Sequence, residues 1–142
     1  MKSNNYFTWI IDANMNIQSI RKLITRVVQP QMQKEIMLGR WRLTYSEKAL
    51  EKTGLSMDDI DAVELNEAFA AQALYCIKKA NWDINKVNLN GGAVALGHPL
   101  GISGTRIITT LLNVLEQQDK SMGLATMCVG TGQGITTIIK RG

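Results

Sequence analysis

The chain contains one histidine, His98, and two cysteines, Cys76 and Cys128. Imidazole exchanges a proton near neutral pH and a deprotonated thiol is a nucleophile or base, so these side chains are the first candidates for chemistry. His98 lies between Gly97 and Gly101, and such small residues let the backbone approach a ligand closely. A structural role is the alternative for each of the three, since a lone histidine or a cysteine in an apolar segment commonly belongs to the core.

The two cysteines stand in different surroundings. Cys128 ends an apolar segment just before Gly130, Gly132 and Gly134, whereas Cys76 lies in the middle of an apolar helical segment. A thiol in mid-helix is far from the helix N-terminus that would activate it, so we interpret Cys76 as a buried structural residue. Two cysteines and one histidine provide neither a disulfide framework nor a ligand set for structural zinc, so we expect free thiols and no metal.

Asn66 stands at a predicted junction between a strand and a helix. Residues 61–65 have the pattern of a short strand, and residues 67–80 that of a helix that is apolar nearly all round. Asparagine is a favoured N-cap, and Glu67 would then lie at the positive end of the helix dipole. A helix with apolar residues on every side is expected to be buried between two layers.

The remaining pattern alternates between helix and strand, which indicates an α/β fold with a mixed sheet and layered helices. The other predicted elements are a helix over residues 46–53 closed by Gly54, a strand over 87–90, a helix over 103–118, and an antiparallel strand pair over 123–129 and 135–139.

Residues 1–42 differ in character from residues 43–142. They hold seven Lys or Arg and two Asp or Glu, a net charge of +5, while the rest of the chain has a net charge of −1. We predict a basic head, helical or disordered, in which residues 17–28 have helical spacing and end before Pro30. No aromatic-interleaved basic motif accompanies the charge, so nucleic-acid binding is not expected.

Several classes of protein are not supported by the sequence. No apolar run is long enough for a membrane span, and the first residues do not have the pattern of a secretory signal, so we expect a cytoplasmic protein without a membrane partner. The glycine-rich stretches match neither a P-loop nor a dinucleotide-binding fingerprint, so nucleotide hydrolysis is not expected.

Three stretches, Asn66-Glu67-Ala68-Phe69, Gly97-His98-Pro99-Leu100-Gly101 and Cys128-Val129-Gly130-Thr131-Gly132, occur in this order. They resemble the carboxyl-terminal active-site motifs of the thiolases, and the resemblance covers about residues 46–142. It implies a partial thiolase-like carboxyl-terminal domain over residues 43–142, preceded by a head over residues 1–42 that does not resemble the family.

The resemblance also implies roles for four residues. The histidine that matches His98 takes the proton of the nucleophilic cysteine and donates to the thioester oxygen. The cysteine that matches Cys128 removes the α-proton of a second acyl-CoA and returns a proton to the leaving thiolate. The backbone N–H of Gly130 would stabilise an oxyanion, and Asn66 would hold a water beside the other oxyanion site.

The thiolase nucleophile lies in the amino-terminal half of the family, which this chain is too short to contain. The resemblance therefore implies acyl transfer between CoA thioesters, as in fatty acid metabolism, that is incomplete in this chain alone. Acyl-CoA would be the substrate, with no further cofactor, and a complementary amino-terminal half or a second copy would be the partner. Two alternatives stay open: an inactive truncated gene product, or a non-catalytic interaction protein on a thiolase-like scaffold.

Overall fold

A computed structural model describes residues 43–130 and 133–142. The chain divides into two units, Met1–Gln31 and Met32–Gly142, and every described residue belongs to the second. The predicted helix over residues 17–28 and the rest of the basic head lie outside the described residues. Within the described ranges, no helix is both long enough and apolar enough to cross a membrane.

A mixed sheet of three strands forms the centre of the fold, as predicted. Strand β1 (Ala62–Leu65) pairs parallel with β2 (Met122–Gly130), which pairs antiparallel with β3 (Gln133–Lys140). In the parallel register, Ala62 lies opposite Gly123 and Leu65 opposite Thr126. The carboxyl ends of β1 and β2 therefore reach the same edge of the sheet.

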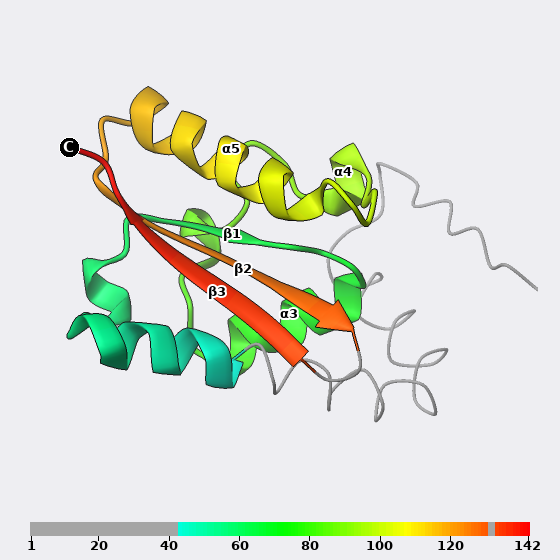
Figure 1. The fold of residues 1–142 in the computed structure, drawn as a ribbon, viewed down its shortest axis with the longest axis horizontal. Helices are drawn as coiled ribbons and strands as arrows, with labels where there is room; N and C mark the ends of the chain where they lie inside the picture. The colour runs from blue at the N-terminus through cyan, green and yellow to red at the C-terminus, as the bar shows by residue number, and fades with distance from the viewer. Residues whose placement is uncertain (1–42, 131–132) are drawn as a thin grey trace, which may run out of the picture. The chain divides into compact units, whose positions relative to one another are not determined.

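Helices cover both faces of this sheet (Figure 1). Helix α5 (Ser103–Gln117) lies on one face, while α3 (Ala70–Lys79) and a helix through residues 43–53 lie on the other. The latter helix ends at Gly54, as predicted, where a φ of 69° suits glycine. The shorter elements are α4 (Ala93–Leu96), η1 (Met57–Asp59) and η2 (Ile84–Lys86).

Each face of the sheet has its own hydrophobic core. On the α3 face, Val63, Leu65 and Leu124 pack with residues from α3 and the helix through 43–53. On the α5 face, the small residues Ala62 and Ala125 pack against the buried side of α5. Side chains of successive strand residues point to opposite faces, which explains how neighbours in β1 enter different cores.

The prediction that Asn66 caps the following helix is wrong. Helix α3 begins at Ala70 with Phe69 as its N-cap. Asn66 instead continues the strand pairing, because its backbone N–H donates to the carbonyl oxygen of Thr126 at 3.0 Å. Glu67 therefore lies outside the first turn of α3, and its carboxylate accepts a hydrogen bond of 2.9 Å from the backbone N–H of Val94, at the start of α4.

The predicted strand over residues 87–90 is reduced to one bridge, between Val87 and Val63. Asn88 has a φ of 51°, a left-handed conformation that turns the chain away from the sheet. Its side-chain amide replaces the missing strand pairing: Oδ1 accepts from the backbone N–H of Leu65 at 2.8 Å, and Nδ2 donates to the carbonyl of Leu65 at 2.9 Å.

Helix α3 is not buried between two layers by the described residues, contrary to expectation. Ala73 and Cys76 lie in the core, but Leu74 is 48% exposed and Phe69, at the N-cap, is 50% exposed. One apolar side of this helix therefore faces outward.

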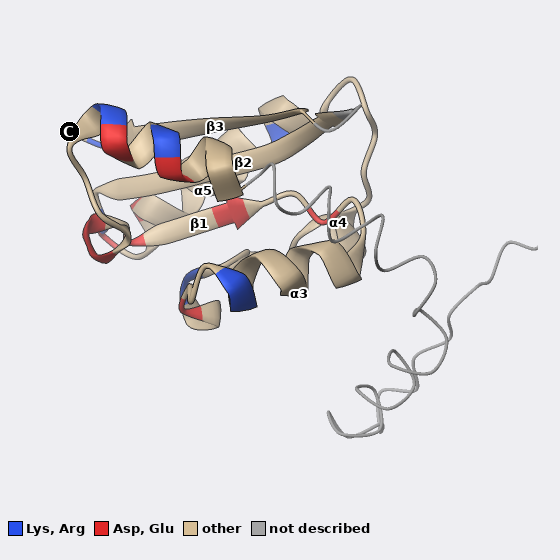
Figure 2. Ribbon diagram, turned by 90° about the horizontal axis from the view of Figure 1, so that it is seen from below, with Lys and Arg blue, Asp and Glu red and all other residues tan. Residues whose placement is uncertain are grey.

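The charged residues lie mainly at the other end of the described fold, near the C-terminus and away from α4 (Figure 2).

Candidate active site

The first two motifs touch at the edge of the sheet where β1 and β2 end, and the third lies at the end of β2. Asn66 comes directly after β1 and hydrogen-bonds to Thr126 on β2, and Cys128 lies two residues further along that strand. Crevices at the carboxyl ends of parallel strands are the usual place for ligands in open α/β sheets. The parallel pairing thus places Asn66 beside the strand that holds Cys128, 62 positions further along the sequence.

The loop between α4 and α5 holds His98. Helix α4 ends at Gly97, whose φ of 93° is in the region that favours glycine. The His98 Nδ1 atom is hydrogen-bonded to the hydroxyl of Ser103, the first residue of α5. That hydroxyl can donate its only proton to the carbonyl oxygen of Pro99 at 3.0 Å, and in this arrangement it accepts from His98. In the same arrangement the neutral ring carries its proton on Nδ1 and a lone pair on Nε2.

Asn66 meets the other side of the imidazole ring. Its Nδ2 atom lies 3.4 Å from His98 Nε2, and its Oδ1 atom accepts a hydrogen bond of 3.2 Å from Nη2 of Arg106. Arginine has donors and no acceptor, so the atom of Asn66 that faces Arg106 must be the oxygen. The NH2 group of Asn66 consequently points at the Nε2 lone pair of His98.

Behind Asn66 lies a buried pair of opposite charges. Glu64, in β1, is 1% exposed, and its Oε2 lies 3.9 Å from Nη1 of Arg106. Burial raises the pKa of Glu64 from 4.5 to about 7, although the charge of Arg106 opposes this rise and that of Glu67 adds to it. A carboxyl group with this pKa exists in both protonation states near neutral pH.

Cys128 and Gly130 flank an irregularity in the sheet. Cys128 pairs with Gly134, but Gly130 already pairs with Gln133, so the register shifts between the two residues. Two steps along β2 thus match one step along β3, which is the arrangement of a β-bulge, and bulges frequently lie beside active sites. Cys128 is half-buried, and the next residues, 131–132, lie outside the described ranges.

The structure thus places Asn66 and His98 in contact, and Cys128 and Gly130 at the end of the adjacent strand. The other cysteine, Cys76, is fully buried in the core on the α3 face, in agreement with a structural role. Among the described residues, no three His, Cys, Asp or Glu side chains come together as metal ligands would.

Three residues of this site were missed from the sequence: Glu64, Ser103 and Arg106. Two signals could have revealed them. Glu64 is the one charged residue in a strand that is otherwise apolar, and Ser103 extends the buried i, i+4 stripe of α5, with Arg106 three residues further along. Polar residues at core positions require partners, so each pointed to a buried polar contact.

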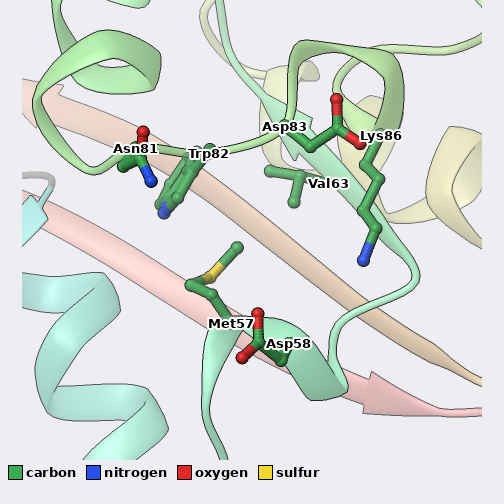
Figure 3. A pocket seen from close by; sticks show the side chains of 7 residues that line it. All are labelled: Met57, Asp58, Val63, Asn81, Trp82, Asp83 and Lys86. Atoms are coloured by element: carbon green, nitrogen blue, oxygen red, sulfur yellow. The ribbon is translucent and has the colours of Figure 1, made fainter.

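A hollow on another part of the surface contains none of the motif residues. It has a volume of about 110 Å³, and Figure 3 shows the seven side chains around it. The ammonium group of Lys86 at its rim already donates to the carbonyl of Ile60 at 2.8 Å. The residues that line the hollow are Met57, Asp58, Val63, Asn81, Trp82, Asp83 and Lys86.

Comparisons with known proteins show which proteins this chain is similar to. A model of the family described as "Thiolase, C-terminal domain" matches residues 19–141. The 3-ketoacyl-CoA thiolase of Pseudoalteromonas atlantica is 63% identical over 108 residues, which cover 74% of this chain and 28% of that protein. A 3-ketoacyl-CoA thiolase of Vibrio cholerae is 58% identical over the same shares of the two chains.

Solved structures give the same result. Human mitochondrial 3-ketoacyl-CoA thiolase matches with a TM-score of 0.71 and 45% identity, over 74% of this chain and 27% of that one. The acetyl-CoA acetyltransferase of Bacillus anthracis matches with a TM-score of 0.71 and 42% identity, over 72% and 26%.

The extent of these matches also shows which part of its relatives this chain corresponds to. It spans little more than a quarter of the length of the curated relatives it matches. The family match begins at residue 19 and so extends into residues 1–42, while the boundary after residue 42 stays a prediction. With the fold, the motif order and these matches in agreement, the chain belongs to the thiolase family, within its C-terminal domain.

Proposed function

We propose that this chain supplies the carboxyl-terminal part of a thiolase active site, which transfers acyl groups between CoA thioesters when a complementary amino-terminal part provides the nucleophilic cysteine. The observation that carries the proposal is the contact between Asn66 and His98 at the carboxyl edge of the sheet, 3.4 Å between Nδ2 and Nε2. A cytoplasmic location fits this function.

In this proposal His98 is the base that activates the nucleophile. Its Nδ1–H is held by Ser103, so Nε2 carries the lone pair, and an incoming thiol would replace the Asn66 NH2 group, 3.4 Å away, as the donor to that lone pair. The resulting imidazolium N–H can then donate to the thioester oxygen as that oxygen gains negative charge. One side chain thus serves two successive tasks.

Cys128 acts on the second substrate. Its thiolate takes the α-proton of an acyl-CoA, and the carbanion attacks the carbonyl carbon of the acyl-enzyme, so a carbon–carbon bond forms as the thioester to the enzyme breaks. The half-buried position of Cys128 at the end of β2 leaves its thiol within reach of a ligand at this edge. The backbone N–H of Gly130 and a water held by Asn66 are the proposed oxyanion donors.

The partner would cover the outward side of α3. An apolar groove of about 250 Å³ runs between α3 and α4, and it includes Leu74 and Val94, which are 48% and 69% exposed. Exposed apolar surface of this kind marks a contact with another chain or domain. An amino-terminal thiolase part is the proposed occupant, and a second copy of this chain is the competing one.

Complementation tests the proposal. The full chain is co-expressed with the part of the Pseudoalteromonas atlantica relative that lies outside its match, and thiolysis of a 3-ketoacyl-CoA is measured. We expect activity from the pair and none from either chain alone, because covalent catalysis needs the thiol, the base and the oxyanion donors together. Activity of this chain alone, with an acyl adduct on Cys76 or Cys128, would overturn the assignment of the nucleophile.

Variants of the active pair test the residue roles. Cys128→Ser should still form the acyl-enzyme but lose carbon–carbon bond formation, since a hydroxyl is a far weaker acid than a thiol. The matched variant Cys76→Ser should retain both half-reactions. His98→Ala should reduce both half-reactions by about 10²-fold or more. If the two chains form a stable complex without activity, the interaction-protein alternative is favoured instead.

A further inference from the structure

The guanidinium group of Arg106 is committed to Asn66. Its side chain is 13% exposed, and in the part of the chain that the structure describes, Nη2 donates to Asn66 Oδ1 whereas Nε and Nη1 have no hydrogen-bond partner. Few arginines are buried to this degree without being fully paired. Hydrogen bonding of the guanidinium group alone therefore does not explain why Arg106 contacts Asn66.

The reason lies in the two ends of the Asn66 amide. One end is a carbonyl oxygen that only accepts, and the other is an NH2 group that only donates. Arg106 can donate to the oxygen but has no lone pair for the NH2 group, so it distinguishes the two orientations. With the oxygen turned to Arg106, the NH2 group faces His98 Nε2 at 3.4 Å.

The orientation of this amide affects which ring nitrogen of His98 is basic. An NH2 group that faces Nε2 requires a lone pair on Nε2. The contact of Nδ1 with Ser103 requires the same tautomer, because it places the proton on Nδ1. A reversed amide would place Oδ1 against Nε2, where it would stabilise a proton on that nitrogen. A neutral ring protonated on Nε2 has no lone pair on the side of Asn66 with which to accept a proton.

Glu64 in turn holds Arg106. Its carboxylate lies 3.9 Å from Nη1 and is 1% exposed, and neither of its oxygens has a hydrogen-bond partner among the described residues. Two buried groups of opposite charge stabilise one another, and removal of either leaves the other unpaired. When Glu64 is ionised, its charge therefore attracts the guanidinium and holds it between β1 and the first turns of α5.

We propose that Arg106 is a positioning residue: anchored by Glu64, it orients the Asn66 amide so that the NH2 end faces His98 and the imidazole keeps its basic lone pair on Nε2. The catalytic meaning of this arrangement rests on the proposed function. The arrangement itself belongs to the folded chain and does not depend on substrate or partner.

Nuclear magnetic resonance of the ring nitrogens tests the proposal directly. His98 is the only histidine, so ¹⁵N-histidine labelling of the full chain yields the signals of this one ring. At a pH where the ring is neutral, we expect the Nδ1 signal to be that of a protonated nitrogen and the Nε2 signal that of an unprotonated one. In Arg106→Met the ratio of the two tautomers should fall by about tenfold, the effect of losing one hydrogen bond to a charged group.

Two further variants complete the experiment. Glu64→Gln/Arg106→Met removes both buried charges, and it should show the same tautomer shift even where Arg106→Met alone is too unstable to study. Arg141→Met is the matched control, since it removes an arginine that donates to Leu115 and Asp119 at the other end of α5. We expect it to leave the tautomer ratio unchanged.

The outcomes separate the two proposals. Wild-type tautomer ratios in folded Arg106→Met or in the double variant would overturn the positioning role, as would an equal shift in Arg141→Met. A shift confined to the Arg106 variants supports it. Because the ring signals are read without CoA or a partner chain, failed complementation would count against the proposed function and leave this result intact.

Discussion

The two faces of the sheet are covered to different degrees. On the α5 face the packing is closed: Leu111 is fully buried, and a Cβ added at Gly123 would come within 2.8 Å of its side chain. On the α3 face the described residues leave an apolar groove beside Leu74. The chain thus has one face that is complete in itself and one that has the character of an interface.

The two faces of the sheet contribute differently to the candidate site. Its polar support, Glu64, Arg106 and Ser103, comes from the closed α5 side, where well-packed neighbours can hold side chains in place. On the open α3 side, the described residues that line the groove are mostly apolar, with Glu67 and Asn88 among them. Orientation of the candidate site residues is therefore internal to this chain, whereas the proposed function assigns the cover over them to a partner.

The sharpest test of this comparison is the same substitution on each face. Leu111→Ala should lower the free energy of unfolding by about 2–5 kcal/mol, because it opens a cavity in closed packing. Leu74→Ala should lower it by less than about 1 kcal/mol in the chain alone, since that side chain is 48% exposed. Denaturant unfolding measures both, and equal losses would contradict the comparison.

The next largest effect is a pH dependence of the free energy of unfolding, caused by the buried carboxyl group of Glu64 on the α5 face. Burial raises the pKa of Glu64 from 4.5 to about 7, so between these pH values the folded chain holds a proton that the unfolded chain has released. The free energy of unfolding should therefore fall as the pH rises through this window, by up to about 3 kcal/mol.

Glu64→Gln should remove this pH dependence. The exposed glutamate Glu116, on α5, supplies the control, and Glu116→Gln should keep the wild-type slope. Unfolding measured at pH 5 and pH 8 compares the three proteins. A wild-type slope that survives Glu64→Gln would show that another group is responsible.

A smaller effect is expected from the close approach of α5 to β2. Gly123→Ala places a methyl group against Leu111 and should cost about 1–3 kcal/mol. Gly104→Ala is the matched control, since a Cβ there meets only the sulfur of Met127, at 3.7 Å. It should stabilise the chain by up to about 1 kcal/mol, because alanine favours helix more than glycine does.

The smallest effect on folding should accompany the largest on association. Leu74→Lys should change the free energy of unfolding by no more than about 0.5 kcal/mol but reduce self-association and binding of an apolar dye. Leu112→Lys, on α5 and 42% exposed, lies outside the groove and should change neither. Sedimentation and dye fluorescence distinguish the two variants, and the same response from both would argue against a specific interface.

Local patterns predicted most of the elements correctly. The periodicity of α5, the antiparallel pair β2 and β3, and the stop at Gly54 result from side-chain spacing and turn chemistry within a short window. Besides the burial of α3, the errors were at Asn66 and at residues 87–90. In both places a side-chain or backbone group makes a hydrogen bond to a distant strand, and no local rule contains that partner.

The sequence by itself determined the family, the order of the three motifs and the two residues, His98 and Cys128, whose chemistry was sought first. Only the tertiary structure decided how that chemistry is oriented. The parallel pairing of β1 with β2 brings Asn66 beside the strand of Cys128, and α5 crosses the same sheet so that Arg106 reaches Asn66. A hydrogen bond depends on distance and angle between groups far apart in the chain, and folding alone sets both.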